Sequence, residues 1–175
     1  MKLLEDKGDR RAYCTAKKEI REHFEIPPLN LACAIGYGNA VRTVLAEADV
    51  DVNAKDATYG RTPLLWAVTM GHEAVVKLLL DNRDVDVNAK DTKEGLTSLS
   101  WALRMKDETL VNHLLYKGRA DRDCEDGSGR RPLSFIIGDH QGKILTLLLE
   151  KGVEVNFTYE LVSQSDYDKI YWYWC

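Results

Sequence analysis

The most constraining feature of the sequence is an internal repeat with a period of 35 residues. The hexapeptide DVNAKD occupies Asp51–Asp56 and returns unchanged at Asp86–Asp91, and Pro28 returns at the same spacing as Pro63. A fixed period between about 20 and 50 residues is typical of stacked repeat proteins, in which each unit packs only on its neighbours. The sequence therefore predicts a solenoid rather than a single central core.

Each unit carries the signals of two short antiparallel helices. Pro28 and Pro63 suit a first helical turn, where the missing N–H costs no hydrogen bond. Gly36 and Gly71 suit the reversal between the two helices, because glycine enters left-handed backbone conformations at little cost. Runs of valine and leucine follow each glycine and supply the buried face of a second helix. These patterns predict an all-α fold of stacked helix-turn-helix units.

The stretch Thr62–Ala67, TPLLWA, followed by Gly71 and His72, resembles the ankyrin repeat, whose pattern is T-P-L-H-x-A. Leu65 departs from that pattern, since the family usually has histidine there. The resemblance implies that His72 bonds backbone groups of a loop and that hairpin-like loops connect the helix pairs. It covers residues 27–157 and implies four repeats, at about 27–59, 60–94, 95–128 and 129–157.

The third of these repeats departs most from the pattern. Ser98 stands where the other units have proline, and Lys106 stands where the second unit has Gly71. Trp101 and Ala102 still match the second unit, so we expect the third unit to fold in the same way. Because stability in a solenoid depends on each unit and its neighbours, we also expect this repeat to open most readily.

Two flanking segments are expected to cap the stack, since a solenoid needs a polar outer face at each end. Residues 1–26 have apolar positions at helical spacing among many charges, which predicts an N-terminal capping helix; they also resemble the end of a degenerate repeat, as if a longer array preceded them. Residues 158–175 form an aromatic tail with a similar stripe, in which Tyr171 and Trp174 lie on the stripe and Trp172 lies off it. We interpret the tail as a C-terminal cap, and Trp172 leaves open a contact with a second copy of the chain, a ligand, or a part of the protein outside this sequence.

Charge and hydropathy exclude several classes of partner. The net charge of −4 and the isoelectric point near 5.6 provide no general basic field for a phosphate backbone, so we expect no nucleic-acid partner. No run approaches the roughly 18 apolar residues of a membrane-spanning helix, and the N-terminus lacks the apolar run of a signal peptide. We therefore expect an intracellular protein, cytoplasmic or nuclear, that does not enter a membrane.

No motif indicates metal, cofactor or catalytic chemistry. The four cysteines include no C-x-x-C pair. The acidic stretch Asp121–Gly127 lacks the glycine and glutamate that a calcium loop of the EF-hand type requires at its sixth and twelfth positions. Neither a phosphate-binding glycine loop nor a serine or cysteine nucleophile motif is present. We expect no metal, no cofactor and no catalytic residues.

The resemblance also implies a binding surface, because partners of ankyrin proteins commonly contact the loop tips and exposed first-helix positions that form the concave face. Within this set Arg104, beside Trp101 and Met105, is the best candidate for an anchor, since arginine and aromatic residues dominate interface hot spots. Large side chains at the column Leu31, Trp66, Trp101 and Phe135 either stack between repeats or form an apolar floor. The candidate partner-binding residues are Tyr59, Trp66, Thr69, Met70, Glu94, Trp101, Arg104, Met105 and Asp139, with Tyr171, Trp172 and Trp174 in the tail.

Two functions are compatible with these patterns. The leading hypothesis is a non-catalytic protein–protein interaction module that binds a partner protein on its concave face. The alternative is a small-molecule-binding protein or a cofactor-independent enzyme that uses a pocket between the concave groove and the aromatic tail. An enclosed pocket beside the tail would favour the alternative, and an open groove would favour the interaction module.

Overall fold

The structure is a computed structural model that describes residues 26–117, 119–136, 142–150 and 152. These residues form seven α-helices and one 3-10 helix, with no β-strand among them. The all-α prediction is therefore confirmed. The predicted capping segments, 1–26 apart from its last residue and 158–175, lie outside the described part of the chain. In chain order the helices are α2 (Pro28–Ile35), α3 (Gly38–Leu45), α4 (Pro63–Thr69), α5 (Glu73–Leu80), α6 (Ser98–Arg104), α7 (Glu108–Tyr116), η1 (Pro132–Phe135) and α8 (Gly142–Glu150).

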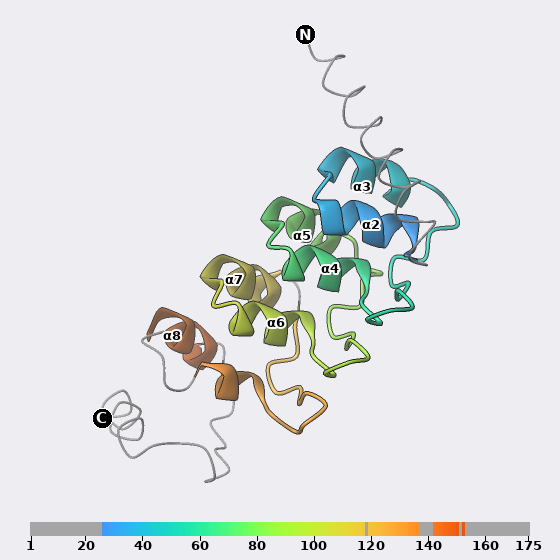
Figure 1. The fold of residues 1–175 in the computed structure, drawn as a ribbon. Coiled ribbons are helices and arrows are strands. Elements are labelled where there is room, and N and C mark those ends of the chain that lie inside the picture. Colours follow the sequence, from blue (N-terminus) through green and yellow to red (C-terminus); the bar gives the residue numbers. More distant parts are fainter. Residues whose placement is uncertain (1–25, 118, 137–141, 151, 153–175) are drawn as a thin grey trace, which may run out of the picture.

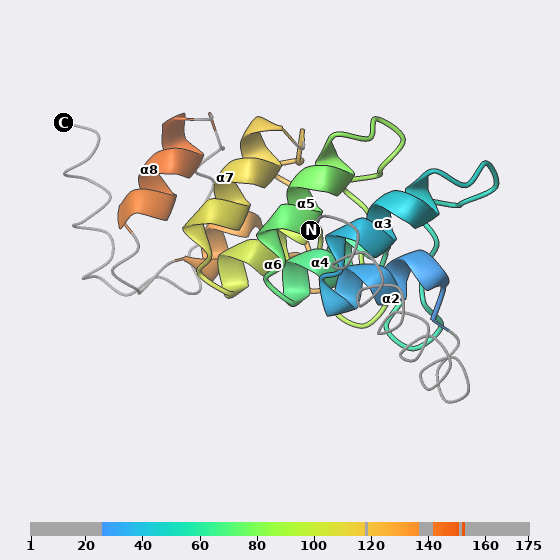
Figure 2. The same ribbon diagram turned by 90° about the horizontal axis from the view of Figure 1, so that it is seen from above.

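The helices are arranged as a row of antiparallel pairs (Figure 1). The first helices α2, α4 and α6 pack on one another in sequence, and the second helices α3, α5, α7 and α8 form a parallel layer beside them (Figure 2). In the fourth pair the 3-10 helix η1 takes the place of the first α-helix and packs against α6. Each pair therefore contacts mainly its neighbours, as the 35-residue period predicts.

Local sequence signals begin and end the helices. Thr62 caps α4 by accepting a hydrogen bond from the backbone N–H of Leu65, and Thr97 caps α6 in the same way through Ser100. The reversal after α4 uses Gly71 with φ of 73°, a left-handed conformation. At the equivalent position of the third pair Lys106 has φ of 61°. A residue other than glycine adopts this left-handed backbone conformation only at a cost in free energy.

Apolar side chains from both layers form one continuous core. Leu64, Leu65 and Ala67 of α4 are at most 1% exposed, and Leu99 and Leu103 of α6 are fully buried. Leu65, the departure from the ankyrin pattern, is fully buried. None of the helices in the described ranges is both long and apolar enough to cross a bilayer.

Polar bonds join one pair to the next. His72 Nε2 lies 3.0 Å from the carbonyl oxygen of Ala34 at the end of α2, so its partner is a helix carbonyl rather than a loop group. Asn53 donates to the carbonyl of Asp84 at 2.8 Å and accepts from the N–H of Asp86 at 2.7 Å. These bonds fix the spacing between neighbouring loops, which carry the candidate site.

Candidate functional site

A buried carboxylate organises the loop that precedes α4. Asp56, which is 2% exposed, accepts hydrogen bonds from the backbone N–H groups of Thr58, Tyr59 and Arg61 at 2.7–2.9 Å. Its Oδ2 also accepts from the indole Nε1 of Trp66 at 3.0 Å. Four donors therefore stabilise this buried charge, and the same contacts fix the direction of the Trp66 ring.

The next loop repeats this arrangement 35 residues later. Asp91 accepts from the N–H groups of Glu94 and Gly95 at 2.8 and 3.0 Å, and from Trp101 Nε1 at 2.8 Å. The backbone N–H and hydroxyl of Thr92 both donate to the carbonyl of Tyr59 at 3.0 Å, which joins the two loop tips. The repeated sequence thus holds two tryptophan rings in register on successive repeats.

Arg61 lies among three aromatic rings. Its guanidinium carbon is 4.8 Å from the ring centroid of Tyr59, 5.0 Å from that of Trp66 and 4.8 Å from that of Trp101. The Tyr59 and Trp66 rings meet edge to face with centroids 5.7 Å apart. This arrangement places a cation against aromatic rings from three successive repeats, where cation–π attraction is favourable.

Two further cations extend this group. Lys93 Nζ lies 4.4 Å from the centroid of the Tyr59 ring. The guanidinium of Arg104 lies 5.1 Å from the centroid of Trp101 and forms an ion pair with Glu94. Since both members of that pair are almost half exposed, the ion pair orients Arg104 more than it stabilises the fold. We call the following six residues the cation–aromatic cluster: Tyr59, Arg61, Trp66, Lys93, Trp101 and Arg104.

An apolar pair lies one helical turn from the cluster. Met70 and Met105 follow Trp66 and Trp101 by four residues, and they are 48% and 40% exposed. Residues four apart share a helix face, so each methionine lies on the same side as its tryptophan. Thr69 beside them donates its hydroxyl to the carbonyl of Trp66 at 3.1 Å. Methionine is flexible and polarisable and adapts to different partners.

The structure brings most of the predicted site residues together. Tyr59, Trp66, Trp101 and Arg104 belong to one cluster, with Glu94 bonded to it, and Thr69, Met70 and Met105 adjoin it. Trp66 is only 7% exposed, so it supports its neighbours and offers a partner little surface. The remaining predicted residues, Asp139, Tyr171, Trp172 and Trp174, lie outside the described residues.

Sequence reasoning missed Arg61 and Lys93 as members of the site. Arg61 immediately precedes the cap of α4, a position at which the third repeat has the buried Leu96, so comparison between repeats does not indicate a shared role. Lys93 lies at an exposed loop tip, where a single lysine does not by itself indicate a binding role. A usable signal was the presence of a basic residue in each of two successive loops, shortly before the regularly spaced tryptophans Trp66 and Trp101.

In the fourth repeat the buried loop carboxylate has a different partner. Asp126, 6% exposed, forms an ion pair with Arg130 at 2.8 Å, and Arg130 lies 5.1 Å from the Phe135 ring centroid. Burial acts to raise the pKa of the Asp126 carboxyl, but hydrogen bonds from the N–H groups of Arg130 and Ser128 and the Arg130 guanidinium outweigh it and lower that pKa. In this repeat the carboxylate is therefore paired directly with an arginine.

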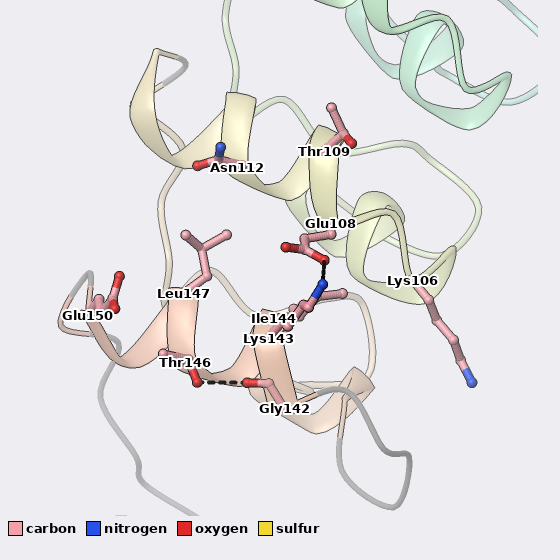
Figure 3. A pocket seen from close by; sticks show the side chains of 10 residues that line it. All are labelled: Lys106, Glu108, Thr109, Asn112, Gly142, Lys143, Ile144, Thr146, Leu147 and Glu150. Atoms are coloured by element: carbon pink, nitrogen blue, oxygen red, sulfur yellow. Dashed lines mark hydrogen bonds and ion pairs between the residues drawn. The ribbon is translucent and has the colours of Figure 1, made fainter.

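A separate cleft opens between the second helices α7 and α8 (Figure 3). It has a volume of about 1040 Å³, is open to solvent, and contains a pair of charges, Lys143 and Glu108, 3.9 Å apart. Ile144 and Leu147 provide its apolar surface. The cleft lies between second helices, whereas the cation–aromatic cluster lies on the loops and first helices. The pocket beside the aromatic tail that the alternative hypothesis requires involves residues outside the described ranges. Within the described ranges no group of three or more His, Cys, Asp or Glu side chains could hold a metal ion.

Comparison with known proteins agrees with this architecture. A family model described as ankyrin repeats (three copies) matches residues 3–91. The crystal structure of the ankyrin repeat domain of Bcl-3, described as a unique member of the IkappaB protein family, matches with a TM-score of 0.67 and 26% sequence identity. The match covers 74% of this chain and 57% of the Bcl-3 chain. No curated protein sequence matches the chain.

Proposed function

This chain belongs to the ankyrin repeat family, and we propose that it binds a segment of a partner protein on its concave face, without catalysis. Ankyrin repeats are generally protein–protein interaction modules. The proposed surface consists of the cation–aromatic cluster together with Met70 and Met105. Its rigid scaffold presents these side chains in fixed positions, which reduces the entropy that binding must overcome.

One observation carries the proposal. Among the described residues the exposed large apolar side chains are Met70, Met105 and Tyr116, and the first two are the C-cap residues of the successive first helices α4 and α6. Exposed apolar side chains that gather beside polar groups are typical of interaction sites. Met105 directly follows Arg104, whose guanidinium lies over the Trp101 ring, so apolar contact and charge-assisted hydrogen bonds are available close together.

Affinity capture from native lysate tests the proposal. The baits are the wild type and a double variant with Met70→Gln and Met105→Gln, which keeps side-chain length and removes apolar character. We expect protein bands retained by the wild type to be lost with the double variant. Tyr116→Gln is the matched control, because it makes an exposed apolar side chain polar on the second-helix layer.

Two results would contradict the proposal. Bands that remain with the double variant, or that are lost equally with a folded Tyr116→Gln variant, place the binding surface elsewhere. Loss of bound metabolites in place of proteins would favour a small-molecule function. Circular dichroism of each bait confirms that the helices are intact.

A further inference from the structure

The second and fourth repeats each place an aspartate, an arginine and an aromatic ring together. The arginine pairs with the aspartate in the fourth repeat but not in the second. In both, an arginine two residues before the proline lies over the aromatic ring three residues after it. In the fourth repeat Asp126 Oδ2 accepts from Arg130 Nε at 2.8 Å. In the second repeat the indole N–H of Trp66 bonds to the equivalent oxygen of Asp56. The side chain of Phe135 has no N–H to occupy the carboxylate, so the identity of the aromatic residue determines whether the arginine can pair with the aspartate.

Arg61 is consequently left without a carboxylate partner in the part of the chain that the structure describes. Its Nε is buried and has no hydrogen-bond partner there. The side chain as a whole is only partly buried, which leaves its terminal nitrogens to meet solvent or a bound molecule. An arginine presents donors in a fork that matches a carboxylate, and an aromatic setting restricts the fork to few orientations.

The charges around Arg61 favour an anionic partner. Lys93 and Arg104 lie over the same rings, and both are exposed. The acidic groups on the inner side are Asp56 and Asp91, whose oxygens already accept the N–H bonds of the loops and indoles and which are 2% and 5% exposed. Glu94 compensates Arg104 directly. The outward surface of the cluster is therefore cationic, although the whole chain carries a net charge of −4.

We propose that Arg61 is a carboxylate receptor and that the partner segment is acidic, with an Asp or Glu side chain bound by the Arg61 guanidinium. This inference rests on the proposed function, since it identifies the chemistry of the segment that the concave face binds. Apolar side chains of the same segment contact Met70 and Met105. Trp66 acts as a positioning residue, because its N–H keeps Asp56 from pairing with Arg61.

The geometry favours an acidic peptide over single-stranded nucleic acid. Proteins that bind single strands offer aromatic faces on which bases stack. In this cluster the rings of Tyr59, Trp66 and Trp101 are already contacted by cations. A phosphate could still be attracted, but bases would have to displace those cations to stack.

Selection from a library of short random peptides tests the inference on the full chain. We expect the recovered peptides to be enriched in Asp and Glu and to bind Arg61→Gln about tenfold more weakly, the loss of a hydrogen-bonded charge pair. Trp66→Phe should also weaken them, because Asp56 then becomes free to pair with Arg61 as Asp126 pairs with Arg130. Arg42→Gln is the matched control: it makes the same change of charge on an exposed position of α3, and affinity should not change.

Thermal melts first establish that each variant is folded. Peptides without acidic enrichment that bind Arg61→Gln normally but are lost with Met70→Gln and Met105→Gln would overturn the carboxylate inference and leave the proposed function intact. If all recovered peptides are insensitive to both sets of variants, or none is recovered, both fail. An oligothymidylate that binds more tightly than the acidic peptides, and does so through Arg61, would overturn the peptide as the class of partner.

Discussion

Replacing Gly95 by alanine should destabilise the protein much more than the same change at Gly129. Both glycines have a left-handed backbone, with φ of 68° and 75°. A Cβ at Gly95 would lie 2.5 Å from the backbone nitrogen of Gly127 and 2.8 Å from its Cα, whereas a Cβ at Gly129 would meet no atom within 4 Å. Comparing the two variants therefore separates the free-energy cost of backbone strain, which both share, from the cost of the close approach of two loops, which only Gly95→Ala has.

The expected magnitudes follow from these contacts. Left-handed backbone costs a residue with a side chain about 1–2 kcal/mol, and this term is common to both variants. The reduced entropy of the unfolded chain, about 0.4–1 kcal/mol in favour of alanine, is also common. At Gly95 the overlap with backbone adds about 1–3 kcal/mol, and the 2.9 Å hydrogen bond from Gly127 N–H to the Glu94 carbonyl is lost or stretched. Gly129→Ala should thus cost about 1 kcal/mol and Gly95→Ala about 3 kcal/mol.

Urea unfolding followed by far-ultraviolet circular dichroism measures both values. Gly71→Ala is a further control, because Gly71 has φ of 73° and open space around its Cβ direction. Gly95→Ala should also displace Glu94 and so weaken its ion pair with Arg104. If Gly95→Ala and Gly129→Ala lower the free energy of unfolding equally, the loops do not approach as closely as described and the reasoning is refuted.

Three further results are expected. Lys106→Gly should raise the urea midpoint by the equivalent of about 0.5–1 kcal/mol, because it removes the strain of φ 61°; a lower midpoint would contradict this. Burial raises the pKa of the Cys33 thiol to about 12, so at pH 8 iodoacetamide should modify Cys33 only after unfolding, and equal rates in folded and unfolded protein would refute its burial. Because the pKa of Asp126 is lowered in the folded state, its contribution to stability is present above about pH 4 and is lost as the pH falls further. Asp126→Asn should therefore flatten the fall in urea midpoint between pH 5 and pH 2, and an unchanged slope would contradict the assignment.

The sequence predicted the architecture because every repeat must bury the same faces. The return of Pro28 as Pro63 located helix starts, and the all-α stack is confirmed. The 3-10 helix Pro132–Phe135 was not predicted, since its Pro-Leu start resembles that of α4. A pattern of apolar residues determines which face is buried, but it does not determine how tightly a short helix winds.

The candidate site was only partly predictable, because its geometry depends on contacts that a linear pattern does not show. The hexapeptide identified Asp56 and Asp91 as repeated residues, but not that each bonds to the indole N–H ten residues later. Trp66 and Trp101 could be read either as stacking residues or as an apolar floor. The structure shows Trp66 nearly covered and Trp101 more open, so equivalent positions differ in exposure.

The departure from the repeat that matters most for our proposal lies inside the most regular unit. The sequence directed attention to the imperfect third repeat, where Arg104 was the best candidate for an anchor. Arg61 belongs to the second repeat, and its counterpart in the third is the fully buried Leu96. Because the Asp–Trp pairs are regular, Arg61 has no carboxylate left to pair with and lies over rings of two repeats. The regular Asp–Trp pairs thus leave the guanidinium of Arg61, which has no basic counterpart in the third repeat, available for binding.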